Sequence, residues 1–172
     1  MKVNSLLIFT LMLSLISCGG GYKLTPNKYY IPEKYKFRLI NKFQLTDTSI
    51  LSTTRLYQYN CFKDRWFKFY KDGRVLFAFD SNVPKNLSDQ IFGYAGFYTL
   101  DGDKLRIELT YTQKRNDWYI LRLEGNVKGD KIIFYKDQPR GIKRNIEHFT
   151  IDSVGCNYIK TNEPYLLLPA DW

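Results

Sequence analysis

The sequence predicts an all-β protein whose main domain is an antiparallel, up-and-down β-barrel of about eight strands. Three observations lead to this prediction. Aromatic residues make up 17% of the chain, with 14 Tyr and 12 Phe, and such side chains favour strands. Several short segments alternate between apolar and polar residues, as half-buried strands do. Turns that contain glycine separate these segments at the spacing of β-hairpins.

The clearest alternation runs through Lys104–Thr112. Its apolar side chains share one face, at Leu105, Ile107, Leu109 and Tyr111, and polar side chains occupy the positions between them. Successive side chains of a strand point to opposite faces of the sheet. This segment is therefore predicted to be a strand with one buried face and one face in water.

Three turns that contain glycine predict three hairpins, because glycine readily adopts the positive φ that tight hairpin turns need. The turns lie at 72–73, 101–103 and 128–130. They join Trp66–Tyr70 to Arg74–Phe79, Gly93–Leu100 to Lys104–Thr112, and Trp118–Val127 to Lys131–Lys136. The connection over 113–117 is short and polar, so consecutive strands from Trp66 to Lys136 can form a meander.

Three further segments, Phe37–Phe43, Arg55–Asn60 and Ile146–Asp152, also have strand-like patterns and bring the total to about eight. Many short strands at this spacing suit either a barrel or a sandwich. The meander favours the barrel, because a sandwich usually needs connections that cross between its two sheets. Closing the sheet into a barrel also removes exposed strand edges.

The N-terminus predicts an export signal. The run Leu6–Ile16 is uncharged and 11 residues long, whereas a membrane-spanning helix needs about 20 residues. Ser17-Cys18-Gly19 follows, and this sequence resembles the bacterial lipobox. The resemblance implies cleavage before Cys18, attachment of lipid to its thiol and acylation of the new amino group. Residues 1–17 are therefore predicted to be a signal-peptide helix, and Cys18 to be the lipidated residue.

The chain divides into four predicted regions, which are the signal peptide (1–17), the lipidated cysteine with a flexible tether (18–35), the barrel (36–155) and a C-terminal tail (156–172). Three glycines and two prolines disfavour regular structure in the tether. The tail is apolar over 165–168 and is predicted to dock on the barrel. The resemblance places the protein in the cell envelope. Gly19, where an Asp would hint at retention in the inner membrane, favours the outer membrane.

Three hairpin sequences, at 67–77, 96–105 and 123–132, resemble those of small lipocalin-like bacterial lipoproteins. Their shared patterns are F-x-x-D-G-x-V, G-x-Y-x-x-x-G-D-x-L and G-x-V-x-G-D-x-L. The resemblance covers about Leu56–Ile151 and implies an antiparallel, calycin-type barrel. Members of this group are largely uncharacterised, so the resemblance concerns the fold more than an activity.

Besides Cys18, the chain contains two cysteines, Cys61 and Cys156. An even pair in an exported protein is a candidate disulfide. Two free, buried thiols are the alternative. Reactive-thiol chemistry is not expected, because neither cysteine belongs to a Cys-x-x-Cys pair.

No catalytic or metal site is predicted, and the protein is not expected to be an enzyme or to hold a cofactor. His148 is the one histidine, and a single histidine cannot form a multi-histidine metal site. The sequence lacks a nucleophile elbow, a phosphate-binding loop and a dinucleotide fingerprint. An envelope hydrolase, the least favoured alternative, would need carboxylates near His148.

The apolar strand faces suggest two functions. If these faces converge, their side chains either line an apolar cavity or fill the barrel. The candidates for lining such a cavity are Phe67, Phe69, Val75, Phe77, Phe79, Leu105, Ile107, Leu109, Tyr111, Tyr119, Leu121 and Leu123. The leading hypothesis is a lipid-anchored envelope protein that binds a small apolar ligand or lipid in its lumen. The alternative is a structural or protein-interaction module with a filled barrel and no small-molecule site.

The formal net charge of +9 raises the question of partners. An exported protein does not meet nucleic acid, so no nucleic-acid partner is expected. The expected contacts are the membrane, through the lipid anchor, and the anionic headgroups or glycans outside the cytoplasm. The opposite faces of two strands place aromatic and basic residues together, at Trp66, Lys68, Tyr70, Trp118, Ile120 and Arg122. These faces are either an exposed contact surface or the seat of the C-terminal tail.

Overall fold

The computed structural model describes residues 22–24, 30–32, 37–39, 43–61, 64–79, 93–112, 118–140 and 156–162. These residues form strands, turns and loops and no helix. The predicted signal peptide (1–17), the predicted lipidation site Cys18, and His148 lie outside the described residues.

Ten strands make one sheet. Their bounds are β1 Tyr22–Leu24, β2 Tyr30–Pro32, β3 Leu56–Tyr59, β4 Arg65–Phe69, β5 Arg74–Phe79, β6 Gly93–Asp101, β7 Lys104–Thr112, β8 Trp118–Lys128, β9 Lys131–Arg140 and β10 Tyr158–Lys160.

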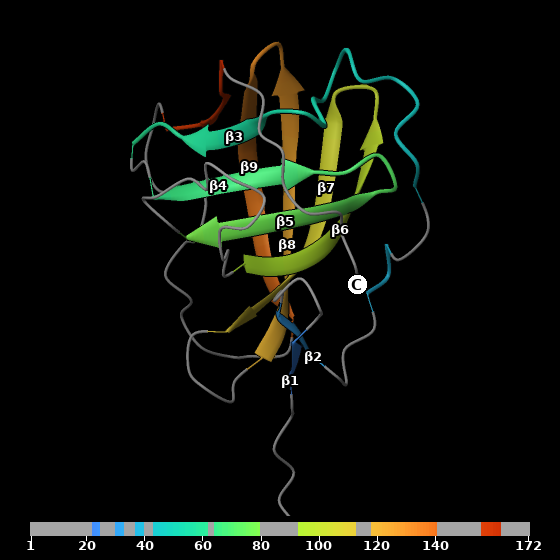
Figure 1. Ribbon diagram of the computed structural model, residues 1–172, viewed down its shortest axis with the longest axis vertical. Helices are drawn as coiled ribbons and strands as arrows, with labels where there is room; N and C mark the ends of the chain where they lie inside the picture. The colour runs from blue at the N-terminus through green and yellow to red at the C-terminus, as the bar shows by residue number, and fades with distance from the viewer. Residues whose placement is uncertain are drawn as a thin grey trace, which may run out of the picture.

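Strands β3 to β10 form a closed, eight-stranded barrel (Figure 1). Each strand pairs antiparallel with the next one in the sequence, and β10 pairs with β3 to close the ring. The predicted antiparallel, up-and-down barrel is therefore confirmed. In Figure 1, β3, β4 and β5 cross in front of β7, β8 and β9, so the barrel has two facing walls.

The three predicted hairpin turns are present. Gly73, Gly102 and Gly129 have φ angles of 79°, 58° and 58°. A side chain is strained at such values, and glycine has none. These turns set the register of the hairpins β4–β5, β6–β7 and β8–β9.

The strand predicted at Phe37–Phe43 is not observed, since Phe37, Arg38, Leu39 and Phe43 lie outside any strand. Phe37 instead packs against the outer face of the barrel, with its ring centroid 4.9 Å from that of Phe97. The backbone N–H groups of Arg38 and Leu39 donate to the side chain of Glu108. These amides therefore do not join a strand ladder. The strand predicted at Ile146–Asp152 lies outside the described residues.

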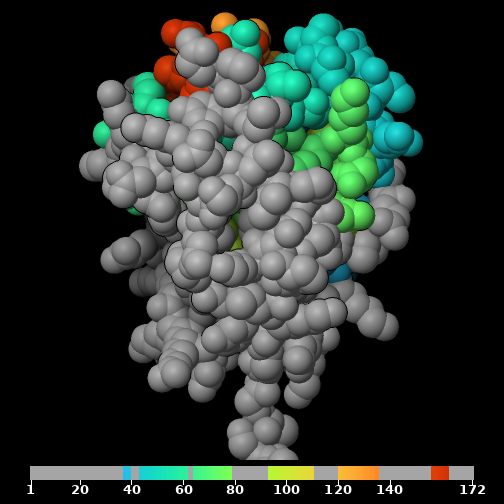
Figure 2. Space-filling view, viewed as in Figure 1, coloured from blue at the N-terminus to red at the C-terminus, as the bar shows by residue number. Residues whose placement is uncertain are grey.

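Strand β10 supplies the eighth strand of the ring and was not predicted. It lies beyond residue 155, where the barrel was expected to end, and it contains only three residues. In Figure 2, β10 (red) reaches the surface at the top of the view. Strands β1 and β2 fall within the predicted flexible tether. They pair with each other, and β2 adds to β6 in parallel at Tyr30 and Tyr94.

A disulfide joins Cys61 and Cys156 beside the β3–β10 seam, with the two Cα atoms 5.6 Å apart. Backbone bonds continue the pairing on both sides of the short strands. The N–H of Asn60 donates to the carbonyl of Asn157 (3.0 Å), and that of Thr161 donates to the carbonyl of Leu56 (2.9 Å). The seam is thus held by more than its ladder.

Candidate functional site

The barrel interior brings together the predicted cavity residues whose side chains the structure describes. One continuous core contains Phe67, Phe69, Val75, Phe77, Leu105, Ile107, Leu109, Leu121 and Leu123. The side chains of Phe79, Tyr111 and Tyr119 lie outside the described residues. The core also includes residues that were not singled out from the sequence, at Leu45, Leu51, Tyr57, Tyr59, Tyr98, Val127, Ile132, Phe134 and Tyr158.

These interior side chains pack against one another. The ring of Phe67 lies 4.7 Å from those of Phe77 and Tyr158 and 5.6 Å from that of Phe134, measured between centroids. Phe67 therefore contacts side chains of both walls and of the closing strand. The nine described candidates are at most 1% exposed. Side chains that line a water-filled cavity would keep accessible area, so this part of the interior is filled.

The predicted aromatic and basic contact surface is mostly covered: Trp66, Lys68 and Ile120 are buried, and Tyr70 and Arg122 are half-buried. Trp66 and Lys68 lie on the outer face of β4 but are only 0% and 4% exposed. The ammonium group of Lys68 donates to the carbonyl of Thr53 (2.7 Å). Burial disfavours the charged ammonium and lowers the pKa of Lys68 to about 8. Ile120 is buried under Phe37 and Leu39, and the side chain of Trp118 lies outside the described residues.

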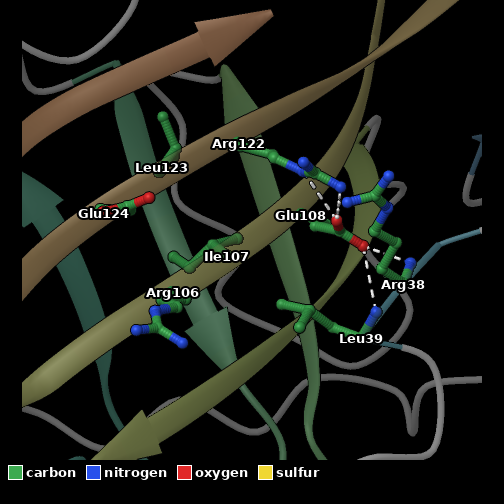
Figure 3. Close-up of a pocket in the computed structure, with 8 residues that line it drawn as sticks. All are labelled: Arg38, Leu39, Arg106, Ile107, Glu108, Arg122, Leu123 and Glu124. Atoms are coloured by element: carbon green, nitrogen blue, oxygen red, sulfur yellow. Dashed lines mark hydrogen bonds and ion pairs between the residues drawn. The ribbon is translucent and has the colours of Figure 1, made fainter. Parts of the chain in front are cut away.

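A pocket of about 240 Å³ lies on the outer face of β7 and β8 (Figure 3). Segment 37–39 forms its third side. The pocket is lined by Arg38, Leu39, Arg106, Ile107, Glu108, Arg122, Leu123 and Glu124. Five of these eight residues are charged.

Glu108 organises one end of this pocket. Its side chain is only 4% exposed, and both carboxylate oxygens accept hydrogen bonds. One oxygen accepts from Nε and Nη2 of Arg122, at 2.8 and 2.6 Å. The other accepts from the backbone N–H groups of Arg38 (2.5 Å) and Leu39 (3.1 Å). Figure 3 shows these four bonds meeting at Glu108. A buried carboxylate needs such partners to offset its desolvation.

Two cross-strand pairs, each of one acidic and one basic residue, form the floor of the pocket. Glu108 of β7 lies opposite Arg122 of β8, and Arg106 of β7 lies opposite Glu124 of β8. These four charges cancel in sum. Arg38 adds a fifth charge from segment 37–39, so the pocket carries a net charge of +1, three arginines less two glutamates.

Sequence reasoning placed Arg122 on the outer face of its strand but missed Glu108, because Glu108 sits at a polar position of an alternating strand. Such positions are normally in water, whereas Glu108 is covered by segment 37–39 and by Arg122. The signal that could have indicated this site was a glutamate and an arginine at outward-facing positions of two strands predicted to be neighbours in the meander.

Among the described residues, no three His, Cys, Asp or Glu side chains come together as metal ligands would. None of the described segments forms a helix long and apolar enough to cross a membrane.

The class of protein that these observations define is a closed, eight-stranded, antiparallel β-barrel, packed in the described part of its interior and with a charged pocket on its outer wall. The chain matches no protein-family model, no curated protein and no solved structure.

Proposed function

We propose that the protein is a lipid-anchored interaction module of the bacterial cell envelope, in which a packed barrel carries a recognition surface on its outer wall. The packing of the barrel interior is the observation that carries this proposal. Phe67 and its neighbours bridge the two walls, which suits a rigid scaffold. Rigid elements hold a binding surface in a defined geometry.

A carrier of an apolar ligand, the other function suggested by the sequence, would need a cavity among these same side chains. Small-molecule sites usually have volumes of about 300–1,000 Å³. The described cavity candidates are at most 1% exposed and contact one another. This packing supports the interaction module over the lumen carrier.

The anchor in this proposal rests on the sequence of the N-terminus. The apolar run Leu6–Ile16 and the lipobox-like sequence that ends at Cys18 support lipid attachment. Two or more acyl chains hold a protein stably on a membrane. Gly19 supports the outer membrane as the location. No reaction is proposed for the protein.

The interior is tested by native mass spectrometry of the protein purified from the envelope of its own host. We expect the mass of the lipidated protein alone, and no uptake of benzene. The variant F67A is the positive control, because it opens a dry cavity beside Phe77 and Tyr158 that can take up benzene. An apolar molecule released from the wild-type protein on denaturation would overturn the proposal and favour the lumen carrier.

The anchor is tested separately. The variant C18S has no thiol at the lipidation position, so we expect it to leave the membrane fraction. The matched control is C61S/C156S, which loses two thiols but keeps Cys18 and should remain with the membrane. Retention of C18S in the membrane fraction would contradict lipid attachment at this residue.

A further inference from the structure

We propose that the pocket between β7, β8 and segment 37–39 binds a single anionic oxygen group, a carboxylate or a phosphate, through the guanidinium groups of Arg38 and Arg122. This inference deepens the proposed interaction module and rests on it only in placing recognition on the outer wall. It does not depend on how the barrel interior is packed.

Arg122 is held in place before any ligand arrives. Two of its N–H groups donate to Glu108, and Glu108 is itself held by two backbone amides. A guanidinium has five N–H donors, so three remain. No described residue accepts a hydrogen bond from these three. An arginine that is already fixed loses little freedom when it binds a ligand.

Arg38 supplies a second guanidinium at the same end of the pocket. Its backbone N–H donates to Glu108, which brings its exposed side chain alongside Arg122 (Figure 3). Within the described part of the chain, no carboxylate pairs with this guanidinium. Two arginines that converge on an open pocket are a typical arrangement for binding carboxylate or phosphate, because each planar guanidinium can donate two parallel N–H bonds.

The distribution of charge decides where the anion binds. Arg106 and Glu124 face each other across the strands and lie at the far end of the pocket in Figure 3. The carboxylate of Glu124 disfavours an anion there. At the opposite end, where Glu108 lies, Arg122 neutralises the charge of Glu108, and the positive charge of Arg38 remains. The excess positive charge therefore lies between Arg38 and Arg122.

The size of the pocket limits the ligand. Its volume of about 240 Å³ is below the range of about 300–1,000 Å³ for drug-sized molecules. The pocket therefore suits one anionic group, either a free solute or the exposed head of a larger molecule such as a phospholipid.

The variant R38Q tests this site, because it removes the guanidinium but keeps the backbone N–H that holds Glu108. The full chain is titrated with inorganic phosphate and with acetate, and binding is measured by calorimetry. We expect saturable binding to the wild-type protein and about tenfold weaker binding to R38Q. The matched control is K131Q, which removes an exposed cation from another hairpin and should leave the affinity unchanged.

Absence of saturable binding of both probes to the wild-type protein would overturn the proposal. Equal weakening in R38Q and K131Q would also overturn it, because that result indicates diffuse attraction to a basic surface. The interior test with benzene is independent of both outcomes, so failure of the anion site and failure of the packed-barrel proposal can be told apart.

A second measurement identifies the source of the anion. The Nε–H resonances of Arg38 and Arg122 are followed by NMR with the protein in nanodiscs of phosphatidylcholine. Phosphatidylglycerol is added to the discs in one experiment, and inorganic phosphate is added to the buffer in another. Both resonances shift on addition of phosphatidylglycerol if a lipid headgroup is the ligand. They shift only on addition of phosphate if the ligand is a free anion. Resonances that move with neither addition contradict the site.

Discussion

The barrel holds together differently in two regions, the wall formed by β7, β8 and β9 and the seam where β10 meets β3. The wall strands contain 9, 11 and 10 residues, whereas β3 and β10 contain four and three. Long paired strands share many ladder hydrogen bonds. Very short strands share few, and an isolated pair of them is not stable in water.

Interactions outside the ladder compensate at the seam. The disulfide Cys61–Cys156 closes one end. At the other end, the hydroxyl of Thr161 accepts from the N–H of Leu56 (3.3 Å). On the opposite side of β10, Lys160 forms an ion pair with Asp130 of the β8–β9 turn. Strand β10 pairs with β3 over three residues and with β9 over two. Covalent and side-chain bonds thus hold the barrel closed where a three-residue strand offers few ladder hydrogen bonds.

The largest expected effect comes from removing the disulfide. The bridge joins residues 95 apart in the sequence, and closing a loop of that length stabilises by about 4–5 kcal/mol on the chain-entropy estimate. We expect C61S/C156S to lose this amount in urea unfolding followed by circular dichroism. Reduced wild-type protein is the control and should show the same loss. A change below about 1 kcal/mol would mean that the ladder of β3 and β10 holds the seam without the bridge.

The next largest effect is expected in the core, where one side chain packs against both the wall and the seam. Phe67 packs against Phe134 of β9 and Tyr158 of β10, so F67A leaves a cavity between the two regions. We expect a loss of about 3–5 kcal/mol in the free energy of unfolding. The control Y135A changes an aromatic residue of β9 that is 53% exposed, and should stay within about 0.5 kcal/mol of wild type. Similar losses for both variants would show that the interior is loosely packed.

A smaller effect concerns the outer side of the wall. E108Q replaces a carboxylate oxygen by an amide, which then faces the N–H donors of Arg122 or of segment 37–39. We expect a loss of about 2 kcal/mol in urea unfolding, because a charge-assisted network is left unsatisfied. The control D101N alters an exposed carboxylate and should change stability by less than about 0.5 kcal/mol. A loss as large as that of C61S/C156S would mean that this network, and not the ladder, mainly holds the wall.

The smallest effect is expected at the exposed ion pair that joins β10 to the β8–β9 turn. The hydrogen bond and charge of Lys160 lower the pKa of Asp130 below its ordinary value of 3.8. A carboxylate with a lowered pKa stabilises the fold above its unfolded pKa, and this contribution disappears as the pH falls through the lowered value. Wild type and D130N should therefore differ slightly in urea unfolding at about pH 7 and converge at about pH 2.

High salt provides the control for this last comparison, because it screens exposed ion pairs. The small difference between wild type and D130N should shrink when salt is added at about pH 7. A difference that persists in acid would show that Asp130 acts through the hairpin turn and not through Lys160.

Local patterns predicted the parts of the fold that depend on neighbours in the sequence. The positive-φ glycines at 73, 102 and 129 placed the hairpins. The alternation in β7 placed Leu105, Ile107 and Leu109 inside the barrel. The same reasoning failed at Phe37–Phe43, because the amides of Arg38 and Leu39 bond to a side chain 70 and 69 residues away. It also missed β10, whose three residues carry too little pattern to recognise.

The sequence by itself determined the all-β class, the meander of hairpins and the apolar inner face, because turn chemistry and side-chain alternation act over a few residues. Only the tertiary structure decided that the described part of the inner face is filled, that β10 closes the ring and that Glu108 is buried on the outer wall. Each of these depends on segments far apart in the chain meeting in space. A polar residue in a strand is exposed by default, and only a distant segment packing over it can bury it and leave a charged pocket at its side.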